Sequence, residues 1–383
     1  MVGMTDATCA RRDPELRPGL EGDAPYGAPQ LAVTHALNVN ENPFGPSDAL
    51  IADAAQAVAE AMRGLNRYPD REFLDLRADL AAHLAEDTGT PLLPPEQVWA
   101  ANGSNEIMAQ LLSAFGGPGH RVLAFAPHYS MYPEYARDTH TEFVVAQRGP
   151  APQFALTSQQ VADAIAEHDP HIVLLTSPNN PTGTALHPAA VDAALDLLEP
   201  RGGVVVVDEA YAEFRRDGVP SALALLPEHP GLVVSRTMSK AFALAGARLG
   251  YVAASRHVID ALRIVRLPYH LSAVTQAVAR TALAHREELL AQVDLLRRER
   301  DALAAHLASE GYEVADSDAN FLLFRTRTDR HAVFERLLAD SILVREVGPA
   351  GWLRVSIGTP DDNRAFMCAL ASADRTDTED TAR

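Results

Sequence analysis

The strongest constraint on the fold of this chain is a repeated alternation of short apolar runs with helix-like segments, beginning near residue 98 and ending near residue 240. The run Gly-Val-Val-Val-Val at 203–207 is typical of a strand buried on both faces. The alternation predicts an α/β domain with a mostly parallel central sheet flanked by helices, and such sheets bind ligands at the carboxyl ends of their strands. We expect strands at 98–101, 121–126, 142–146, 171–176, 203–207 and 232–236, and helices at 48–62, 72–86, 129–137, 158–168 and 188–198.

Polar side chains follow three of these predicted strands. Asn180 follows one strand, Asp208 and Tyr211 follow another, and Lys240 follows the third. Since parallel strands end at a common edge, these side chains should meet at one rim of the sheet. A lysine just past a buried strand is partly desolvated, which suits its amine to form a Schiff base with a carbonyl cofactor. Taken alone, a lysine at this place is more often a solvated surface charge.

A possible anion site lies where the first of these strands ends. The segment 102–106, Asn-Gly-Ser-Asn-Glu, joins the strand to another apolar helix. A glycine turn before a helix N-terminus offers backbone N–H groups and a favourable helix dipole to an anion. The same pattern also describes an ordinary capped turn without a ligand. Beside the lysine, the candidate anion-binding side chains are Thr237, Ser239 and Arg248.

Composition excludes several classes of protein. The chain has 383 residues, enough for two domains, and its net charge of −18 makes nucleic acid or an anionic membrane a poor partner. The two cysteines, Cys9 and Cys368, lie at opposite ends, which argues against a disulfide framework or a zinc site. No apolar run resembles a signal peptide or reaches membrane length. We therefore expect a cytoplasmic protein.

The segments outside the alternation predict a second, smaller α+β domain. Residues before about 31 are rich in proline and glycine and should form an extended arm. A long interrupted helix is expected at 273–310, with the charged run 297–300 on a solvated face. Strands at 312–314, 320–324, 342–345 and 353–358 and a helix at 331–340 should follow, with a frayed tail from about 372. The predicted division is 1–60 for the arm and first helix, 61–272 for the large domain and 273–383 for the small domain.

Together these stretches resemble the fold type I pyridoxal-phosphate aminotransferases, and within them the histidinol-phosphate aminotransferase family. The resemblance extends from 26–31 to 353–360 and covers nearly the whole chain. Its most specific motifs are Asn180-Pro181-Thr182-Gly183, Asp208-Glu209-Ala210-Tyr211, and Ser239-Lys240 followed by Arg248.

The resemblance implies a role for each residue at the rim. Lys240 would hold the aldehyde of pyridoxal 5'-phosphate and move a proton during transamination. Asp208 would pair with the ring nitrogen, while Asn180 and Tyr211 would bond the ring hydroxyl. Tyr129 is similar to the residue that stacks on the ring. Taken one at a time, these side chains could equally be a helix cap, a turn residue and packed aromatics.

The resemblance also implies a homodimer with shared sites. The cofactor phosphate would be bound by Ser104, Asn105, Thr237, Ser239 and Arg248, and by Tyr68 from the neighbouring subunit. The arm and first helix would contact the partner, and the first helix would also lie against the small domain.

Two arginines are implied to bind substrate. Arg354 resembles the arginine that holds the carboxylate of glutamate, and Arg345 matches one that helps bind the phosphate of histidinol phosphate. Asn42 stands where some family members carry tyrosine, so the resemblance does not define which residues surround the substrate phosphate. The expected reaction transfers the amino group between histidinol phosphate and 2-oxoglutarate. The alternatives are an aromatic amino acid aminotransferase, a decarboxylase of the same fold, and a cofactor-sensing regulator, for which a DNA-binding module is missing.

Overall fold

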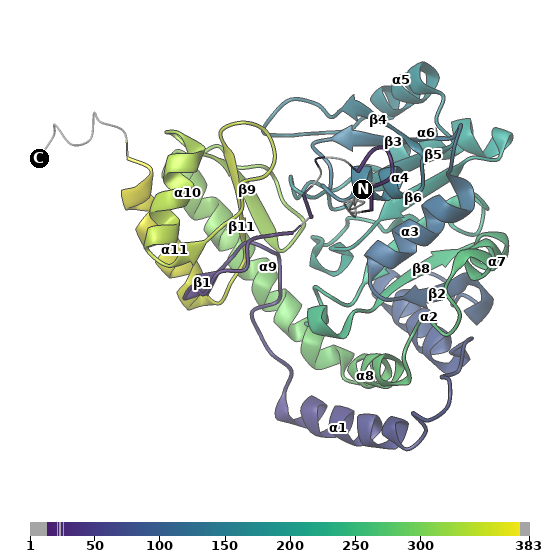
Figure 1. Cartoon of the computed structure of the whole chain (residues 1–383). Coiled ribbons are helices and arrows are strands. Elements are labelled where there is room, and N and C mark those ends of the chain that lie inside the picture. Colours follow the sequence, from purple (N-terminus) through teal and green to yellow (C-terminus); the bar gives the residue numbers. More distant parts are fainter. Residues whose placement is uncertain (1–13, 21, 23, 26, 376–383) are drawn as a thin grey trace, which may run out of the picture.

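The computed structural model describes residues 14–20, 22, 24–25 and 27–375 of the chain. Cys9, Tyr26 and the end of the predicted tail lie outside the described residues. The described chain forms two domains, a large one built on a sheet and a small one that contains its C-terminal part (Figure 1). Within these described ranges, no helix is long and apolar enough to cross a membrane.

A seven-stranded sheet forms the middle of the large domain, in the order β2-β8-β7-β6-β5-β3-β4. Only β8 runs antiparallel to its neighbours, so the prediction of a mostly parallel sheet is confirmed. Every residue of β5, β6 and β7 is buried, as their apolar sequences predict for strands covered on both faces. The strands are β2 (Val98–Ala101), β3 (Arg121–Ala126), β4 (Glu142–Gln147), β5 (Ile172–Thr176), β6 (Val204–Asp208), β7 (Leu232–Thr237) and β8 (Gly250–Ala254).

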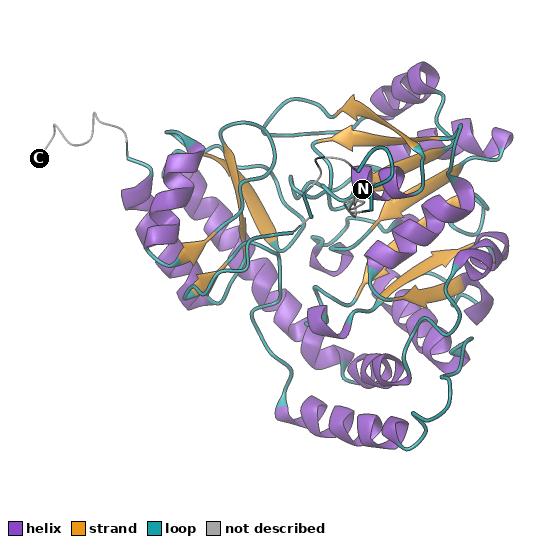
Figure 2. Cartoon of the chain, viewed as in Figure 1, coloured by secondary structure: helices purple, strands orange, loops and turns teal. Residues whose placement is uncertain are grey.

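Helices surround this sheet (Figure 2). Helices α5 and α6 contact each other beside the central strands, whereas α3 contacts α7 and β8. Local signals set several helix starts: Thr157 and Gln160 form a capping box at α5, and proline opens α6. The helices of the large domain are α2 (Leu74–Thr88), α3 (Ser104–Phe115), α4 (Tyr132–Asp138), α5 (Ser158–His168), α6 (Pro188–Leu198) and α7 (Arg256–Val265).

Helix α4 begins three residues later than predicted. The sequence pattern placed its start at Tyr129, but the helix starts at Tyr132 with Pro133 in its first turn. Proline is tolerated in a first turn, because its missing N–H would be unpaired there anyway, and it would interrupt a helix begun earlier. Tyr129 consequently lies in the loop before α4. Strand β8 and helices α7 and α11 (Pro360–Ala373) lie outside the predicted elements.

The small domain combines short strands with helices, as predicted. Strands β9 (Phe321–Arg325) and β11 (Trp352–Ser356) pair antiparallel, and helices α10 (Arg330–Ala339) and α11 contact each other. Of the predicted strand 312–314, only Val314 pairs, through an isolated bridge to Phe324. The N-terminal strand β1 (His35–Ala36) joins this domain by pairing in parallel with β10 (Ile342–Leu343).

The predicted long helix at 273–310 is two helices, α8 (Ala273–Ala284) and α9 (Arg286–Ser309). His285 separates them, and its N–H bonds to the carbonyls of Thr281 and Ala282. Helix α9 then continues into the small domain, while α8 lies against α1 (Asp48–Met62), which stands apart from the rest of the large domain (Figure 1).

The prediction that the run 297–300 is fully solvated was wrong for Arg300. This side chain is fully buried, and it donates to the carbonyls of Phe214 at 2.8 Å and Ala319 at 3.3 Å. The pattern of charged residues alone could not reveal that Arg300 faces inward, where two backbone carbonyls and the carboxylate of Asp301 accept hydrogen bonds from its guanidinium.

Candidate active site

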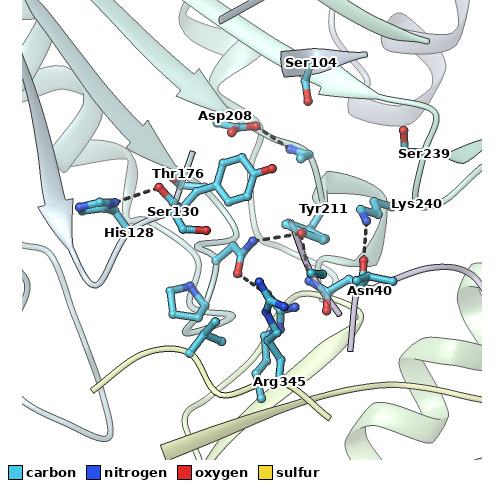
Figure 3. A pocket seen from close by; sticks show the side chains of 18 of the residues that line it. Asn40, Ser104, His128, Ser130, Thr176, Asp208, Tyr211, Ser239, Lys240 and Arg345 are labelled. Atoms are coloured by element: carbon cyan, nitrogen blue, oxygen red, sulfur yellow. Dashed lines mark hydrogen bonds between the residues drawn. The ribbon is translucent and has the colours of Figure 1, made fainter. Parts of the chain in front are cut away.

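A cavity of about 920 Å³ opens at the carboxyl ends of the parallel strands. Its walls come from three parts of the chain: the segment 38–41 after β1, the strand ends of the large domain, and the small-domain residues Arg345 and Arg354 (Figure 3). The position agrees with the rule for open α/β sheets. Most of the predicted site residues line this cavity: Ser104, Asn105, Tyr129, Asn180, Asp208, Tyr211, Thr237, Ser239, Lys240, Arg248, Arg345 and Arg354.

Lys240 lies directly beyond β7, with its amine in the cavity (Figure 3). Its Nζ donates to the carbonyl oxygen of Val39 at 2.8 Å. Burial and the positive charges of Arg354 and Arg248, opposed by Glu41, together lower the pKa of Lys240 to about 8. The amine is therefore partly neutral near physiological pH, as a nucleophile or proton acceptor requires.

Asp208 ends β6 and is 6% exposed. Its carboxylate accepts hydrogen bonds from the hydroxyl of Tyr132 at 3.0 Å and from the N–H of Ala210 at 3.2 Å. Burial raises the pKa of Asp208 to about 6. Across the described ranges Asp208 has no ion-pair partner, so a buried carboxylate faces the cavity without a cation. A ligand with a positively charged or proton-bearing nitrogen would supply one.

Tyr211 is held by two amides. The side-chain nitrogen of Asn40 donates to its hydroxyl at 3.0 Å, and that of Asn180 does so at 3.4 Å. The oxygen of Asn180 in turn accepts a bond from Arg354 at 2.6 Å, and the same guanidinium donates to the carbonyl of Asn38 at 2.7 Å. Because four segments meet here, the phenol and the guanidinium are both fixed in direction.

The start of α3 forms one end of the cavity. Gly103 precedes the helix without a side-chain cap, so the first N–H groups, beginning at Ser104, are open to a ligand. A Cβ on Gly103 would lie 2.5 Å from the guanidinium of Arg248, and one on Gly250 would collide with the backbone nitrogen of Ser104. The two glycines thus allow a close approach that a larger residue would block.

Two hydroxyls complete this end of the cavity. Thr237 and Ser239 are both buried, and their side-chain oxygens lie 3.0 Å apart. Hydroxyls, a guanidinium and an open helix N-terminus together fit a phosphate group.

Arg345 and Arg354 lie opposite each other on neighbouring segments, joined by two reciprocal backbone hydrogen bonds of 2.9 Å. Arg354 is 6% exposed and lies over the ring of Phe321 at 5.1 Å. The Arg345 side chain is half-buried and makes no hydrogen bond or ion pair within residues 27–375. One arginine is thus fixed and the other is available to a ligand.

Two predicted site residues do not line the cavity of their own chain. The amide nitrogen of Asn42 lies 3.4 Å from the carbonyl of Ala241, and its oxygen accepts the N–H of Phe44 at 3.0 Å. Asn40, two residues earlier, lies in the cavity instead. Tyr68 is 79% exposed and stacks on Tyr269 at 4.4 Å, away from the cavity.

Among the residues that sequence reasoning missed are Asn40 and Thr176, which line the cavity, and Tyr132, which bonds to Asp208. The spacing of Asn38, Asn40 and Asn42 shows alternating amides, but not which of them faces inward. Tyr132 follows Tyr129 by three residues, and their rings meet edge to face at 5.7 Å. Because Tyr129 precedes α4, helical spacing does not relate the two side chains, and no local signal identified Tyr132.

Comparison with known proteins identifies the relatives of this chain. The family described as aminotransferase class I and II matches residues 34–370. Histidinol-phosphate aminotransferase of Thermobifida fusca is 56% identical over 361 residues, covering 94% of this chain and 96% of that protein. The enzyme of the same name from Mycolicibacterium smegmatis is 51% identical, covering 94% and 93%.

Solved structures share the fold. Histidinol-phosphate aminotransferase from Sinorhizobium meliloti, in complex with pyridoxal-5'-phosphate, superposes with a TM-score of 0.79 at 24% identity, covering 89% of this chain and 91% of that one. Aspartate aminotransferase from Thermus thermophilus with maleate gives a TM-score of 0.75 at 26% identity, covering 88% and 90%.

Proposed function

This chain belongs to the class I and II aminotransferases, and from that premise we propose that it transfers the amino group between histidinol phosphate and 2-oxoglutarate in histidine biosynthesis. The observation that carries the proposal is the pair Arg345 and Arg354 on the cavity wall beside Lys240. Two guanidiniums suit a reaction in which one site receives a phosphate ester and a dicarboxylate in turn.

The cofactor is pyridoxal 5'-phosphate, which supplies an aldehyde for the amino group and a ring that draws electrons from the bond being broken. The residues present fit this group. We propose that Lys240 binds the aldehyde, Asp208 the ring nitrogen, and Asn180 and Tyr211 the ring hydroxyl, with Tyr129 against the ring face. Its phosphate would be held at the other end of the cavity by Ser104, Asn105, Thr237, Ser239 and Arg248.

The protein side of the chemistry follows from the electrostatics of the cavity. With a pKa of about 8, Lys240 can accept a proton from the substrate carbon and return it without a large cost in either direction. With a pKa of about 6, Asp208 is mostly ionised at neutral pH, and its negative charge stabilises a positive charge on the nitrogen that it faces. The fixed hydroxyl of Tyr211 orients the group that it bonds.

We propose that Arg354, which is fixed, and Arg345, which is available, bind different charged groups of the substrates. Arg354, held by Asn180 and Asn38, is placed for a carboxylate common to glutamate and 2-oxoglutarate. Arg345 is left for the phosphate of histidinol phosphate or for the second carboxylate. An aromatic amino acid has no group for Arg345, which is why we prefer the phosphorylated substrate to the aromatic alternative.

Side-by-side rates test this proposal. We expect kcat/KM for histidinol phosphate to exceed that for phenylalanine by at least about 10-fold, the worth of one good ionic contact. Arg345→Met should remove most of this preference, because it should lower kcat/KM for histidinol phosphate but not that for phenylalanine. Arg325→Met is a matched control, because Arg325 lies on β9 of the same domain and pairs with Glu313 outside the cavity. Equal rates with the two substrates in the unaltered enzyme would favour the aromatic alternative.

We also propose a homodimer with shared sites, in which Tyr68 reaches the cofactor phosphate of the partner. Support comes from its exposure: Tyr68 is 79% exposed and stacks on Tyr269, and Leu65 and Leu267, which are near these two tyrosines in the sequence, are also exposed. The proposed division at residues 60 and 272 assigns the arm and first helix to this contact. The two cysteines at opposite ends support a reducing, cytoplasmic compartment.

Mixed dimers test the shared site. If Tyr68 acts across the interface, a dimer of one Tyr68→Ala chain and one Lys240→Ala chain carries both lesions in one site and leaves the other intact. Activity should then return to about half of the unaltered value per dimer, while each variant alone is nearly inactive under limiting cofactor. Verified mixed dimers without recovered activity would show that each chain builds its own site.

A further inference from the structure

Tyr132 connects the buried carboxylate of the site to the neighbouring strand. The tyrosine is 1% exposed, and its hydroxyl lies 3.0 Å from Asp208 and 2.8 Å from the hydroxyl of Thr176. Thr176 and Asp208 end the paired strands β5 and β6 and are register partners. The hydroxyl of Tyr132 therefore bridges two adjacent strand ends from the first turn of α4.

The chemistry of the three groups fixes the direction of these bonds. An ionised carboxylate can only accept hydrogen bonds, so the single proton of the phenol must point to Asp208. The phenol oxygen must then accept its second bond from Thr176. The result is a directed chain in which Thr176 donates to Tyr132 and Tyr132 donates to Asp208. A tyrosine that only filled the core would need one partner for its hydroxyl, and Thr176 alone would provide it.

The surroundings of Asp208 make this bond important. Burial and the charge of Glu209 both favour the neutral acid, while Tyr132 and the N–H of Ala210 favour the charged form. Arg148 adds a cation on the tyrosine side: it is 7% exposed, and its Nε and one of its terminal nitrogens have no hydrogen-bond partner in the described structure. Burial lowers the pKa of Arg148 to about 10, so it keeps its charge at neutral pH.

We propose that Tyr132 is a positioning residue that keeps Asp208 ionised and directed into the cavity, with Thr176 setting the direction of its hydroxyl. This role deepens the proposed function and rests on it, because it matters only if Asp208 faces the cofactor nitrogen. Tyr132 itself need not touch the cofactor. It acts on the charge of a group that does.

The test is the affinity of the full chain for pyridoxal 5'-phosphate, measured by equilibrium dialysis across pH. Asp208→Asn provides the baseline, because it retains the ionisations of the cofactor and lacks that of the carboxylate. Relative to this baseline, binding to the unaltered chain should weaken as pH falls through the range where Asp208 becomes protonated. The midpoint is the pH at which half of this weakening has occurred. In Tyr132→Phe the midpoint should rise by about one to two pH units, since the charged form of Asp208 loses a hydrogen bond.

Two further variants separate this role from loosened packing. Thr176→Val should raise the midpoint by a smaller amount, because the bond from Tyr132 to Asp208 remains. Tyr135→Phe, which removes a buried hydroxyl one turn later in α4, should leave the midpoint unchanged. If Tyr132→Phe does not fold, as judged by circular dichroism, Thr176→Val still decides the question.

The outcomes are distinguishable from failure of the proposed function. Saturable binding with an unshifted midpoint in both Tyr132→Phe and Thr176→Val would overturn the inference, even if affinity fell equally at every pH. No saturable binding to the unaltered chain would instead overturn the proposed function. Because no amino substrate is present, a wrong substrate assignment would leave the result unaffected.

Discussion

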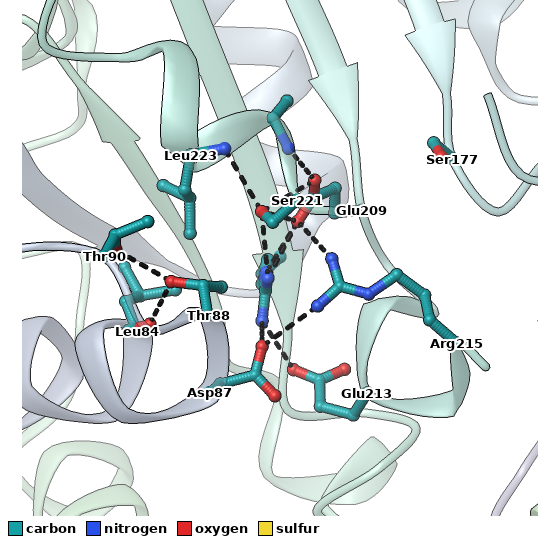
Figure 4. A network of polar contacts seen from close by, with 12 residues as sticks. Leu84, Asp87, Thr88, Thr90, Ser177, Glu209, Glu213, Arg215, Ser221 and Leu223 are labelled. Atoms are coloured by element: carbon teal, nitrogen blue, oxygen red, sulfur yellow. Dashed lines mark hydrogen bonds and ion pairs between the residues drawn. The ribbon is translucent and has the colours of Figure 1, made fainter. Parts of the chain in front are cut away.

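At the ends of β6 and β7, the two faces of the sheet differ in whether their buried charges are paired. Successive residues of a strand point to opposite faces, so Asp208 and Thr237 line the cavity while their neighbours Glu209 and Arg236 enter a separate network (Figure 4). In that network Arg236, which is 1% exposed, lies 2.6 Å from Asp87, 2.8 Å from Glu209 and 3.4 Å from Glu213. Each carboxylate of the network thus has a cation supplied by the chain.

The cavity lacks this balance. Within the described residues Asp208 has no cation beside it, and Lys240 bonds to a carbonyl rather than to a carboxylate. Burial opposes the charge of Arg236, yet Glu209, Asp87 and Glu213 raise its pKa well above the usual value. Lys240, by contrast, has a lowered pKa. The comparison teaches that buried charges matched within the chain hold the strand ends in place, whereas the nearby unmatched charges of Asp208 and Lys240 are left for a ligand.

The largest expected effect comes from the unmatched lysine. Lys240→Ala should reduce transamination by about 10⁴-fold or more, because we propose that Lys240 serves as both the attachment point of the cofactor and the proton carrier. Its melting temperature should stay close to that of the unaltered protein, since the amine makes one hydrogen bond to Val39. Steady-state rates and thermal melts measure the two quantities. Normal turnover by this variant would refute the assignment.

The matched side should show the reverse pattern. Arg236→Met should lower the free energy of unfolding by about 3–5 kcal/mol, because it leaves the buried Glu209 and Glu213 and the half-buried Asp87 without their common cation. Denaturant titration measures this loss. Arg297→Met is the control: it breaks an ion pair with Asp217, which is 97% exposed, and should cost less than about 1 kcal/mol. A similar small loss for both variants would mean that the network contributes little to the fold.

Asp208→Asn should slow transamination by about 10²–10³-fold, because a neutral amide cannot stabilise a positive charge on the cofactor nitrogen that Asp208 is proposed to face. The change is nearly isosteric, so the fold should persist. Single-turnover rates would show the loss in the proton-transfer step. A rate within a factor of a few of the unaltered enzyme would make Asp208 a structural residue.

The smallest expected effect is a pH-dependent difference in the free energy of unfolding between Asp208→Asn and the unaltered chain, both measured without cofactor. Burial raises the folded pKa of Asp208 to about 6, above its unfolded value near 4, so the folded chain binds the proton more tightly. The charged carboxylate consequently destabilises the fold progressively as pH rises from about 4 to about 6. Asp208→Asn should become more stable relative to the unaltered chain over this interval, by about 1–3 kcal/mol, with a constant difference above it. If the difference in the free energy of unfolding were instead constant from pH 4 upward, Asp208 would not have a raised pKa in the folded chain.

The sequence alone was enough for the parallel sheet and for most of the site. The β-branched run of β6 and the polar residues that follow β5, β6 and β7 depend on local pattern and on one rule of sheet geometry. The rule brings strand ends together without any knowledge of distant contacts. The predicted residues Asn180, Asp208 and Lys240 therefore meet in one cavity.

The remaining features depend on contacts that local pattern does not encode. Arg300 reads as a surface charge until the carbonyl of Phe214 is placed beside it. Asn40 and Asn42 differ only in which amide the turn directs toward Tyr211. Tyr132 could be identified only after β5 and β6 were known to present Thr176 and Asp208 side by side. In each case the deciding partner lies far away in the sequence.

The pairing of β1 with β10 has a consequence for how the protein is made. Thr34 bonds to the side chain of Ser341, which lies 307 residues further along the chain, and the segment just after β1 supplies Val39 and Asn40 to the cavity. A ribosome delivers this segment early, yet its partner strand emerges only when most of the polypeptide has been synthesised. Closing so long a loop costs entropy that local contacts cannot repay in advance. We therefore expect the large-domain sheet to be assembled first, with Lys240 receiving its acceptor only near the end of translation.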